Sequence, residues 1–194
     1  MGTIRTAGLV AAALCVAALV VIAEDNVTMN IPPGDYAKKL GNNSFADPDG
    51  KRHSRQQVIG RVVVAIFTAP IMSQGDVQQK WANLLATDPS TKLPDTVALF
   101  IIEDMSQAGW FKGIARDDMK KAFTEDSRPF LLMDERGEAF KRFGVGRGRT
   151  QVLIYDKTGT LRDVETDLKD TDLTVKRIKA ITALLLAEKD ASPH

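Results

Sequence analysis

The chain has 194 residues, of which 44% are hydrophobic and 26% charged, and its formal net charge is +1. This is enough chain for one ordinary globular domain that buries its own core without covalent staples. The near-neutral charge gives no electrostatic basis for binding nucleic acid or an anionic membrane surface, so neither is expected as a partner.

The first 23 residues differ in kind from the rest, because residues 7–23 are apolar throughout and Arg5 is the only charged residue before Glu24. Val21 and Ala23 are small residues at the offsets that favour cleavage before Glu24. Residues 1–23 are therefore predicted to be a secretory signal peptide, which implies export to the periplasm or the medium. The alternative is an uncleaved anchor, since the run has the minimum length of a spanning helix; membrane contact is expected only in that case.

The single cysteine, Cys15, lies inside this leader. Leu14 is not the small residue that lipid attachment at Cys15 would require. Cleavage would leave a chain without any thiol, which could form no disulfide and perform no thiol chemistry.

Residues 24–44 contain several Pro, Gly and Asn and no sustained periodicity, and are predicted to be an irregular arm. The turn signal at residues 47–50 then predicts a leading hairpin. Arg61–Thr68 has a continuous Val-rich run typical of a strand buried on both faces. Asp76–Ala86 follows with apolar residues at helical spacing, and Asp76 is the expected N-cap.

The remaining elements continue the alternation of strands and helices. We expect a strand at Thr96–Ile102, followed by a helix at Ala115–Phe123 that turns Ile114, Met119, Ala122 and Phe123 inward. A strand ending at Met133, a short helix through Phe143 and a hairpin turning at Asp156–Gly159 come next. The last element is a helix at Leu173–Leu186, whose predicted apolar face consists of Val175, Ile178, Ile181, Leu184 and Leu185. Residues 189–194 are a short tail. This order predicts an α/β fold with a mixed sheet flanked by helices.

Two stretches carry a resemblance to a known fold family. "DPDGKRHSRQQVIGRVVVAIFTAPIMSQG" resembles the opening of extracytoplasmic thioredoxin-like proteins and peroxiredoxins, and "PFLLMDERGEAFKRFGVGRGRTQVLIYDKTGTL" resembles the second half of that fold. The resemblance implies a three-layer thioredoxin-like domain over residues 45–188. The order of elements and short strings such as "GRVVV" and "KLP" are also similar to the YtfJ-type periplasmic family.

The departures from the thioredoxin pattern concern its redox site. Laid over that pattern, Met72, Ser73, Gln74 and Gly75 occupy the C-x-x-C positions, and Arg149, followed by Thr150, replaces the proline that is usually cis. Neither reductase nor peroxidase activity is expected from such a site. We assign no catalytic residue, cofactor or metal ligand, and the sequence leaves open whether the chain is an enzyme of another kind.

Other polar and aromatic residues have weaker functional interpretations. Ser73 lacks a plausible base, because His53 lies in the leading hairpin and His194 ends the chain. The adjacent Trp110 and Phe111 could anchor a partner, but covering the core is the favoured interpretation. The acid pair Glu103–Asp104 is read as solvated loop charge.

The basic, glycine-rich stretch 141–149 is the most distinctive polar segment. Its possible ligand-binding residues are Lys141, Arg142, Arg147 and Arg149, which could hold a phosphate or carboxylate, although a solvated loop is the plainer interpretation.

Two functions follow from these observations. The first is an exported, non-redox binding or assembly module that uses the vacated active-site groove, residues 70–75 and 147–150, to bind a protein partner. The alternative is an enzyme of another class that binds an anionic small molecule at residues 141–149.

Overall fold

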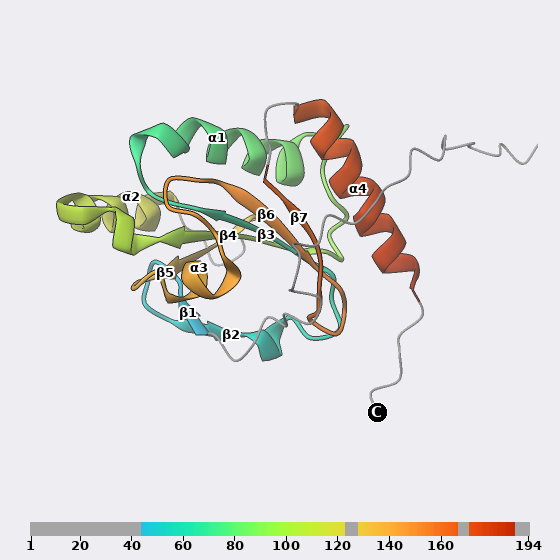
Figure 1. Cartoon of the computed structure of the whole chain (residues 1–194), viewed down its shortest axis with the longest axis horizontal. Coiled ribbons are helices and arrows are strands. Elements are labelled where there is room, and N and C mark those ends of the chain that lie inside the picture. The colour runs from blue at the N-terminus through green and yellow to red at the C-terminus, as the bar shows by residue number, and fades with distance from the viewer. Residues whose placement is uncertain (1–43, 123–127, 167–170, 189–194) are drawn as a thin grey trace, which may run out of the picture.

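The computed structural model describes residues 44–122, 128–166 and 171–188. The predicted signal peptide, most of the predicted arm and the C-terminal tail lie outside these residues. Within them, seven strands form one mixed sheet in the order β2-β1-β5-β4-β3-β6-β7. The expected α/β fold with a mixed, helix-flanked sheet is confirmed (Figure 1).

The bounds of the elements follow the chain in this way. The strands are β1 Ser44–Ala46, β2 Arg52–Ser54, β3 Val63–Thr68, β4 Ala98–Asp104, β5 Phe130–Asp134, β6 Gln151–Tyr155 and β7 Leu161–Glu165. The α-helices are α1 Met72–Ala82, α2 Lys112–Ala122, α3 Glu138–Phe143 and α4 Thr171–Ala187. A π-helical turn, Asn83–Thr87, extends α1, and two short 3-10 turns at residues 105–107 and 109–111 precede α2.

The central strand β3 is buried along its whole length, as its continuous apolar run predicts. It pairs in parallel with β4, with Val63 opposite Ala98 and Thr68 opposite Glu103. On its other side β3 pairs antiparallel with β6. The carboxyl ends of β3 and β4 therefore meet at one edge of the sheet.

Alternate residues of the strands enter two separate cores. One core lies between the sheet and helices α1 and α4, with Trp81 and Leu85 from the α1 region and Ile178 and Ile181 from α4. The second lies on the opposite face, where Phe140 and Phe143 of α3 pack edge-on against Phe67. Helices on both faces of the sheet give the three layers visible in Figure 1.

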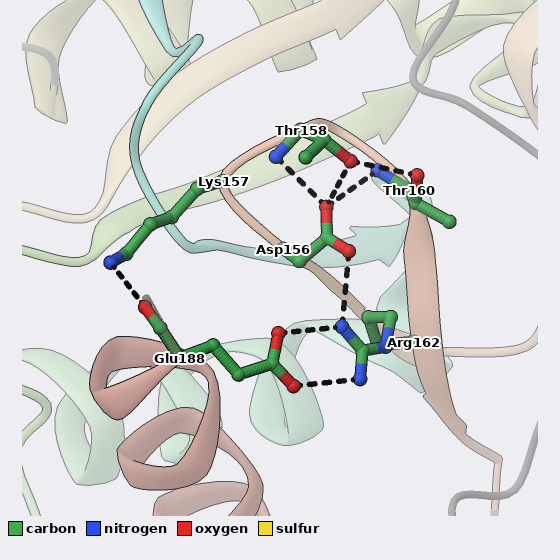
Figure 2. Close-up of polar contacts among 6 residues, drawn as sticks. All are labelled: Asp156, Lys157, Thr158, Thr160, Arg162 and Glu188. Atoms are coloured by element: carbon green, nitrogen blue, oxygen red, sulfur yellow. Dashed lines mark hydrogen bonds and ion pairs between the residues drawn. The ribbon is translucent and has the colours of Figure 1, made fainter. Parts of the chain in front are cut away.

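Helix α4 is fixed to the β6–β7 hairpin at two places. In Figure 2, Arg162 of β7 forms a fork-like ion pair with Glu188 just beyond α4 and also donates to Asp156, at 3.1 Å. Burial alone would raise the pKa of Asp156, but hydrogen bonds from Thr158, Thr160 and Arg162 lower it. The predicted turn at Asp156–Gly159 is thus held by a carboxylate that accepts from the chain following it.

The second contact between α4 and the hairpin is buried. Arg177 of α4 contacts the carboxylates of Asp163, at 2.9 Å, and Glu165 on β7. Asp163 is fully buried and Glu165 nearly so. Because buried carboxylates require a compensating charge, Arg177 supplies the cation that offsets part of theirs, although burial and the neighbouring Asp163 still raise the pKa of Glu165.

Several details of the sequence prediction are wrong. Helix α1 begins at Met72 rather than at Asp76, so Asp76 is an exposed residue within the helix and not its N-cap. In α2, Ile114 and Ala122 are exposed instead of inward, and Leu184 of α4 is exposed as well. Phe123, also expected inward, lies outside the described residues.

Across the part of the chain that the structure describes, no helix has both the length and the apolar character needed to cross a membrane.

Candidate functional site at the carboxyl edge of β3 and β4

The segments that follow β3 and β4 meet at one edge of the sheet, where the sequence places the degenerate redox positions. Thr68 ends β3 and lies opposite Glu103 in the register, one residue before the end of β4. The first turn of α1 begins four residues after Thr68, and the 3-10 turns leading to α2 begin two residues after Glu103. Both lie at the left-hand end of the sheet in Figure 1.

Residues 72–75 form the first turn of α1. The N-cap residue, Ile71, makes no side-chain capping bond, and Met72 and Ser73 are exposed. Gln74 is half-buried and points toward the loop that precedes β6, since its side chain contacts that loop. The structure therefore brings the two halves of the degenerate redox site together.

Gln74 joins these halves by hydrogen bonds. Its amide Nε2 donates to the carbonyl oxygen of Gly148 at 2.8 Å, and its Oε1 accepts from the hydroxyl of Thr150. The Thr150 and Thr68 hydroxyl oxygens are 3.2 Å apart, so Thr68 donates in that pair because the Thr150 proton is already used. Gln74 thus spans the space between α1 and residues 147–150, where the vacated active-site groove is predicted.

The bonds continue from the loop to the end of β4. The backbone N–H of Gly148 donates to Gln107 Oε1 at 2.8 Å, and Gln107 Nε2 donates to Asp104 Oδ2 at 2.7 Å. Asp104 Oδ1 also accepts from the backbone N–H and hydroxyl of Ser106. One continuous set of bonds, which we call the Gln74–Gln107 network, therefore joins the first turn of α1, the loop before β6 and the 3-10 turn after β4.

The turn after β5 approaches this network closely. Gly137 has a φ of 66°, and a Cβ there would lie 2.7 Å from Ser106 Oγ and 2.8 Å from Asp104 Oδ1. Only glycine fits such a place without displacing its neighbours. The D-x-x-G turn at residues 134–137 is thus shaped by Asp104 as well as by its own sequence.

Glu103 is the least expected residue of the site. It is 2% exposed, and its Oε2 has no hydrogen-bond partner in the structure. Burial raises the pKa of Glu103 to about 7, while a hydrogen bond with Gln78 of α1 opposes that shift and the neighbouring Asp104 adds to it. The interpretation of Glu103 and Asp104 as solvated loop charges is wrong, because both side chains are buried.

Large apolar side chains are exposed at the same edge. Met72 is 101% exposed, Trp110 81%, Ile114 56% and Phe111 46%. The Trp110 and Phe111 rings stack with their centroids 3.4 Å apart. The expectation that this aromatic pair covers the core is wrong. We call these four side chains the apolar edge patch.

The basic stretch 141–149 divides between a helix and a loop. Lys141 and Arg142 belong to the last turn of α3, whose C-cap is Gly144, and both are exposed. Arg147 and Arg149 lie in the loop that Gln74 and Gln107 hold, and both are exposed. The structure therefore separates the four cations into two pairs, of which only Arg147 and Arg149 adjoin the degenerate redox positions.

The remaining candidates are placed away from this chemistry. His53 lies on β2, 2.7 Å from Asp47 Oδ2 and edge-on to Phe130, so its ring is engaged there rather than with Ser73. The peptide bond that is cis in the described residues is Arg128–Pro129, and the bonds flanking Arg149 are trans. Among these residues no group of three or more His, Cys, Asp and Glu side chains could hold a metal ion.

Sequence reasoning missed the parts of this site that depend on three-dimensional contacts. Glu103 and Gln107 follow an apolar strand, and nothing in a single sequence tells a buried polar residue at a strand end from a solvated one. The sequence assigns Gln74 to the degenerate redox positions, but its bridging role depends on Thr150, 76 residues later.

Comparisons with known proteins define the fold. No protein-family profile matches the chain, and no curated protein does. Solved structures do match. A putative thiol:disulfide interchange protein DsbE from Chlorobium tepidum has a TM-score of 0.54 at 18% identity, covering 77% of this chain and 98% of that one. The structure of MTB dsbF gives 0.54 at 19% identity, covering 73% and 96%.

A third similar structure is BsSco, of the Sco family of cytochrome c oxidase assembly proteins, with a TM-score of 0.54, 10% identity, and coverage of 76% and 95%. These similarities agree with the observed sheet and its flanking helices. The chain has the thioredoxin-like fold, as the sequence resemblance implies. The YtfJ-type resemblance stays a prediction.

Proposed function

We propose that this protein is an exported, non-redox thioredoxin-like domain that binds a polypeptide partner at the carboxyl edge of β3 and β4. The observation that carries the proposal is the apolar edge patch, which includes Met72, one of the two positions that the thioredoxin-like resemblance assigns to the redox cysteines. A site that has lost its thiols and presents a stacked aromatic pair is suited to binding rather than to electron transfer.

The position of the patch supports a specific role. Four of the seven large hydrophobic residues that are strongly exposed in the described residues, Met72, Trp110, Phe111 and Ile114, belong to this edge. Aromatic side chains and methionine are enriched in protein interfaces, whereas scattered exposed aliphatic residues are common on any surface. The concentration of these side chains at one edge therefore favours a partner.

The surroundings of the patch define the chemistry of that partner. The Gln74–Gln107 network fixes the loops that carry the exposed Arg147 and Arg149, so little ordering is required when a partner binds. Two guanidinium groups beside apolar side chains fit a polypeptide that presents both apolar side chains and carboxylates.

Export is part of the proposal. The apolar leader supports it, and so do structural neighbours described as a secreted disulfide oxidoreductase and an exposed lipoprotein thioredoxin. An assembly role has a parallel in the Sco-type neighbour, whose family takes part in cytochrome c oxidase assembly.

The test is site-specific photo-crosslinking in the full-length chain, expressed in its native compartment. A photoreactive residue replaces Phe111 in one variant and Leu184, which is similarly exposed on α4, in a matched control. We expect a discrete protein adduct from position 111 that is absent from position 184 and weakened by Arg147→Ala/Arg149→Ala. Equal adducts from both positions, or none from 111, would contradict the proposal.

A second measurement separates binding from redox chemistry. The purified protein is expected to show no reduction of insulin disulfides and no thiol-dependent peroxide reduction, since its only cysteine is Cys15 in the leader. Turnover in either assay by a Cys15→Ser variant would contradict the non-redox assignment.

A further inference from the structure

The methionines of the described residues differ sharply in exposure. Met72 is fully exposed, whereas Met105 is 0% and Met133 3% exposed, and Met119 is half-buried. No cysteine follows residue 23. Among residues 44–122, 128–166 and 171–188, the sulfur that a two-electron oxidant can reach is therefore concentrated at Met72.

The position of Met72 within the apolar edge patch means that oxidation of its sulfur would change the polarity of the proposed binding surface. It is the first residue of α1, at the edge that also presents Trp110 and Phe111, and none of the residues that the structure describes covers it. A thioether in this position is an apolar contact for a partner, while its oxidised form is a polar sulfoxide.

We propose that Met72 is a peroxide-oxidised modification site and that its oxidation lowers the affinity of the apolar edge patch for its partner. The sulfur lone pair attacks one oxygen of a hydroperoxide, the O–O bond breaks, and an S–O bond forms. The sulfur loses two electrons, the peroxide gains them, and the second oxygen leaves as water or an alcohol after taking up a proton.

The effect on binding rests on the proposed function, whereas the selectivity of the oxidation does not. Placing a polar sulfoxide where a partner buries a thioether is expected to weaken binding by about fivefold or more. The buried Met105 and Met133 are protected because peroxide cannot reach their sulfur atoms in the folded protein.

The experiment treats the folded, full-length protein with hydrogen peroxide and follows each methionine by peptide mass spectrometry over time. Bis-ANS fluorescence reports the exposed apolar surface in the same samples, and the photo-crosslinker at position 111 reports partner binding. The matched variants are Met72→Leu, which keeps an apolar side chain without oxidisable sulfur, and Met119→Leu, which removes the half-buried methionine of α2.

We expect Met72 to be oxidised at least tenfold faster than Met105 and Met133, because reactivity follows exposure. Peroxide should reduce bis-ANS fluorescence and the adduct yield in the wild type and in Met119→Leu, but not in Met72→Leu. Equal oxidation rates at the four methionines, or losses that persist in Met72→Leu, would overturn the inference.

The three readouts of this experiment also distinguish a failure of this inference from a failure of the proposed function. If no adduct forms even without peroxide, the proposed partner binding has failed, while mass spectrometry and bis-ANS still decide the modification of Met72. If adducts form and are insensitive to peroxide although Met72 is oxidised, the inference fails and the proposed function stands.

Discussion

Asp163 and Glu103 are both buried beneath a helix on the same face of the sheet, but they receive different partners. Asp163 and its neighbour Glu165 share the guanidinium of Arg177 on α4. Glu103 receives a hydrogen bond from the neutral amide of Gln78 on α1, and its second oxygen has no partner. One guanidinium therefore offsets part of the buried charge where α4 docks, although burial and the neighbouring Asp163 still raise the pKa of Glu165 there, whereas Glu103 at the proposed binding edge has only a neutral partner.

This difference in partners indicates where a buried carboxylate adds to the stability of the fold and where its ionisation lowers that stability. A paired carboxylate secures α4 against β7, whereas an unpaired one under α1 favours its protonated form and destabilises the fold when ionised. Uncompensated groups of this kind cluster at functional sites, which agrees with the function proposed for this edge.

The largest expected effect comes from removing the cation of the paired site. Arg177→Met leaves two buried carboxylates without a countercharge and should lower the free energy of unfolding by about 3 to 5 kcal/mol. Urea denaturation at pH 7 measures this loss. The control is the triple variant Arg177→Met/Asp163→Leu/Glu165→Leu. It should regain much of the lost stability, because replacing all three groups with apolar side chains removes the unpaired charge. A triple variant no more stable than Arg177→Met would contradict the argument.

Replacing the unpaired carboxyl of Glu103 should have the opposite effect to Arg177→Met: it should raise the free energy of unfolding at neutral pH. The pKa of Glu103 is raised from 4.5 to about 7 in the folded protein, so folding favours the protonated form. Its contribution to stability is fully present below pH 4.5 and is lost as the pH rises through 7, which amounts to about 3 kcal/mol.

Glu103→Gln tests this sign. The unfolding free energy of the variant, relative to the wild type, should increase between pH 4 and pH 8, because only the wild type must ionise a buried group. A difference between the two proteins that does not change with pH would show that Glu103 is solvated or paired in solution.

A smaller effect is expected within the Gln74–Gln107 network. Gln74→Ala removes the partners of the Gly148 carbonyl and the Thr150 hydroxyl and should cost about 1 to 2 kcal/mol. Faster amide hydrogen exchange at Gly148 and Arg149 would report the loosened loop. Gln79→Ala, on the exposed side of α1, is the control and should leave that exchange unchanged.

The smallest effect on stability is expected for the exposed ion pair between Glu188, just beyond α4, and Arg162 of β7. Glu188→Gln weakens the fork-like contact with Arg162 (Figure 2) and should cost no more than about 1 kcal/mol, with the loss disappearing in high salt. Thermal denaturation at low and high ionic strength measures it. A cost that is independent of salt would indicate a packing role for the side chain instead.

The strands and their order along the chain could be predicted because burial leaves a local pattern. The Val-rich run of β3 and the turn at Asp156–Gly159 are visible in the sequence, and both are confirmed. The start of α1 could not be predicted in the same way, because residues 72–75 include a glycine and lack a capping side chain. The helix begins there because the strand before it ends at Thr68 and the turn brings the chain back over the sheet.

The site was predictable only in its location. The resemblance to the thioredoxin-like pattern brought Met72–Gly75 and Arg149–Thr150 to one edge, and the structure places them together. Trp110 is exposed although it was predicted to be buried, and Glu103 is buried although it was predicted to be solvated. Both predictions followed the general preference for aromatic residues in the core and acidic residues at the surface. At this edge of the sheet these general preferences are reversed for a few residues, and a single sequence does not mark which ones.

The contrast between the two tryptophans has a practical consequence. Trp81 is buried in the core beneath α1, while Trp110 projects into solvent. A collisional quencher such as iodide should therefore suppress the emission of Trp110 and spare that of Trp81. The protein therefore carries its own optical reporter for the proposed binding edge, and shielding of the quenchable component would signal the binding of the proposed partner without any attached dye.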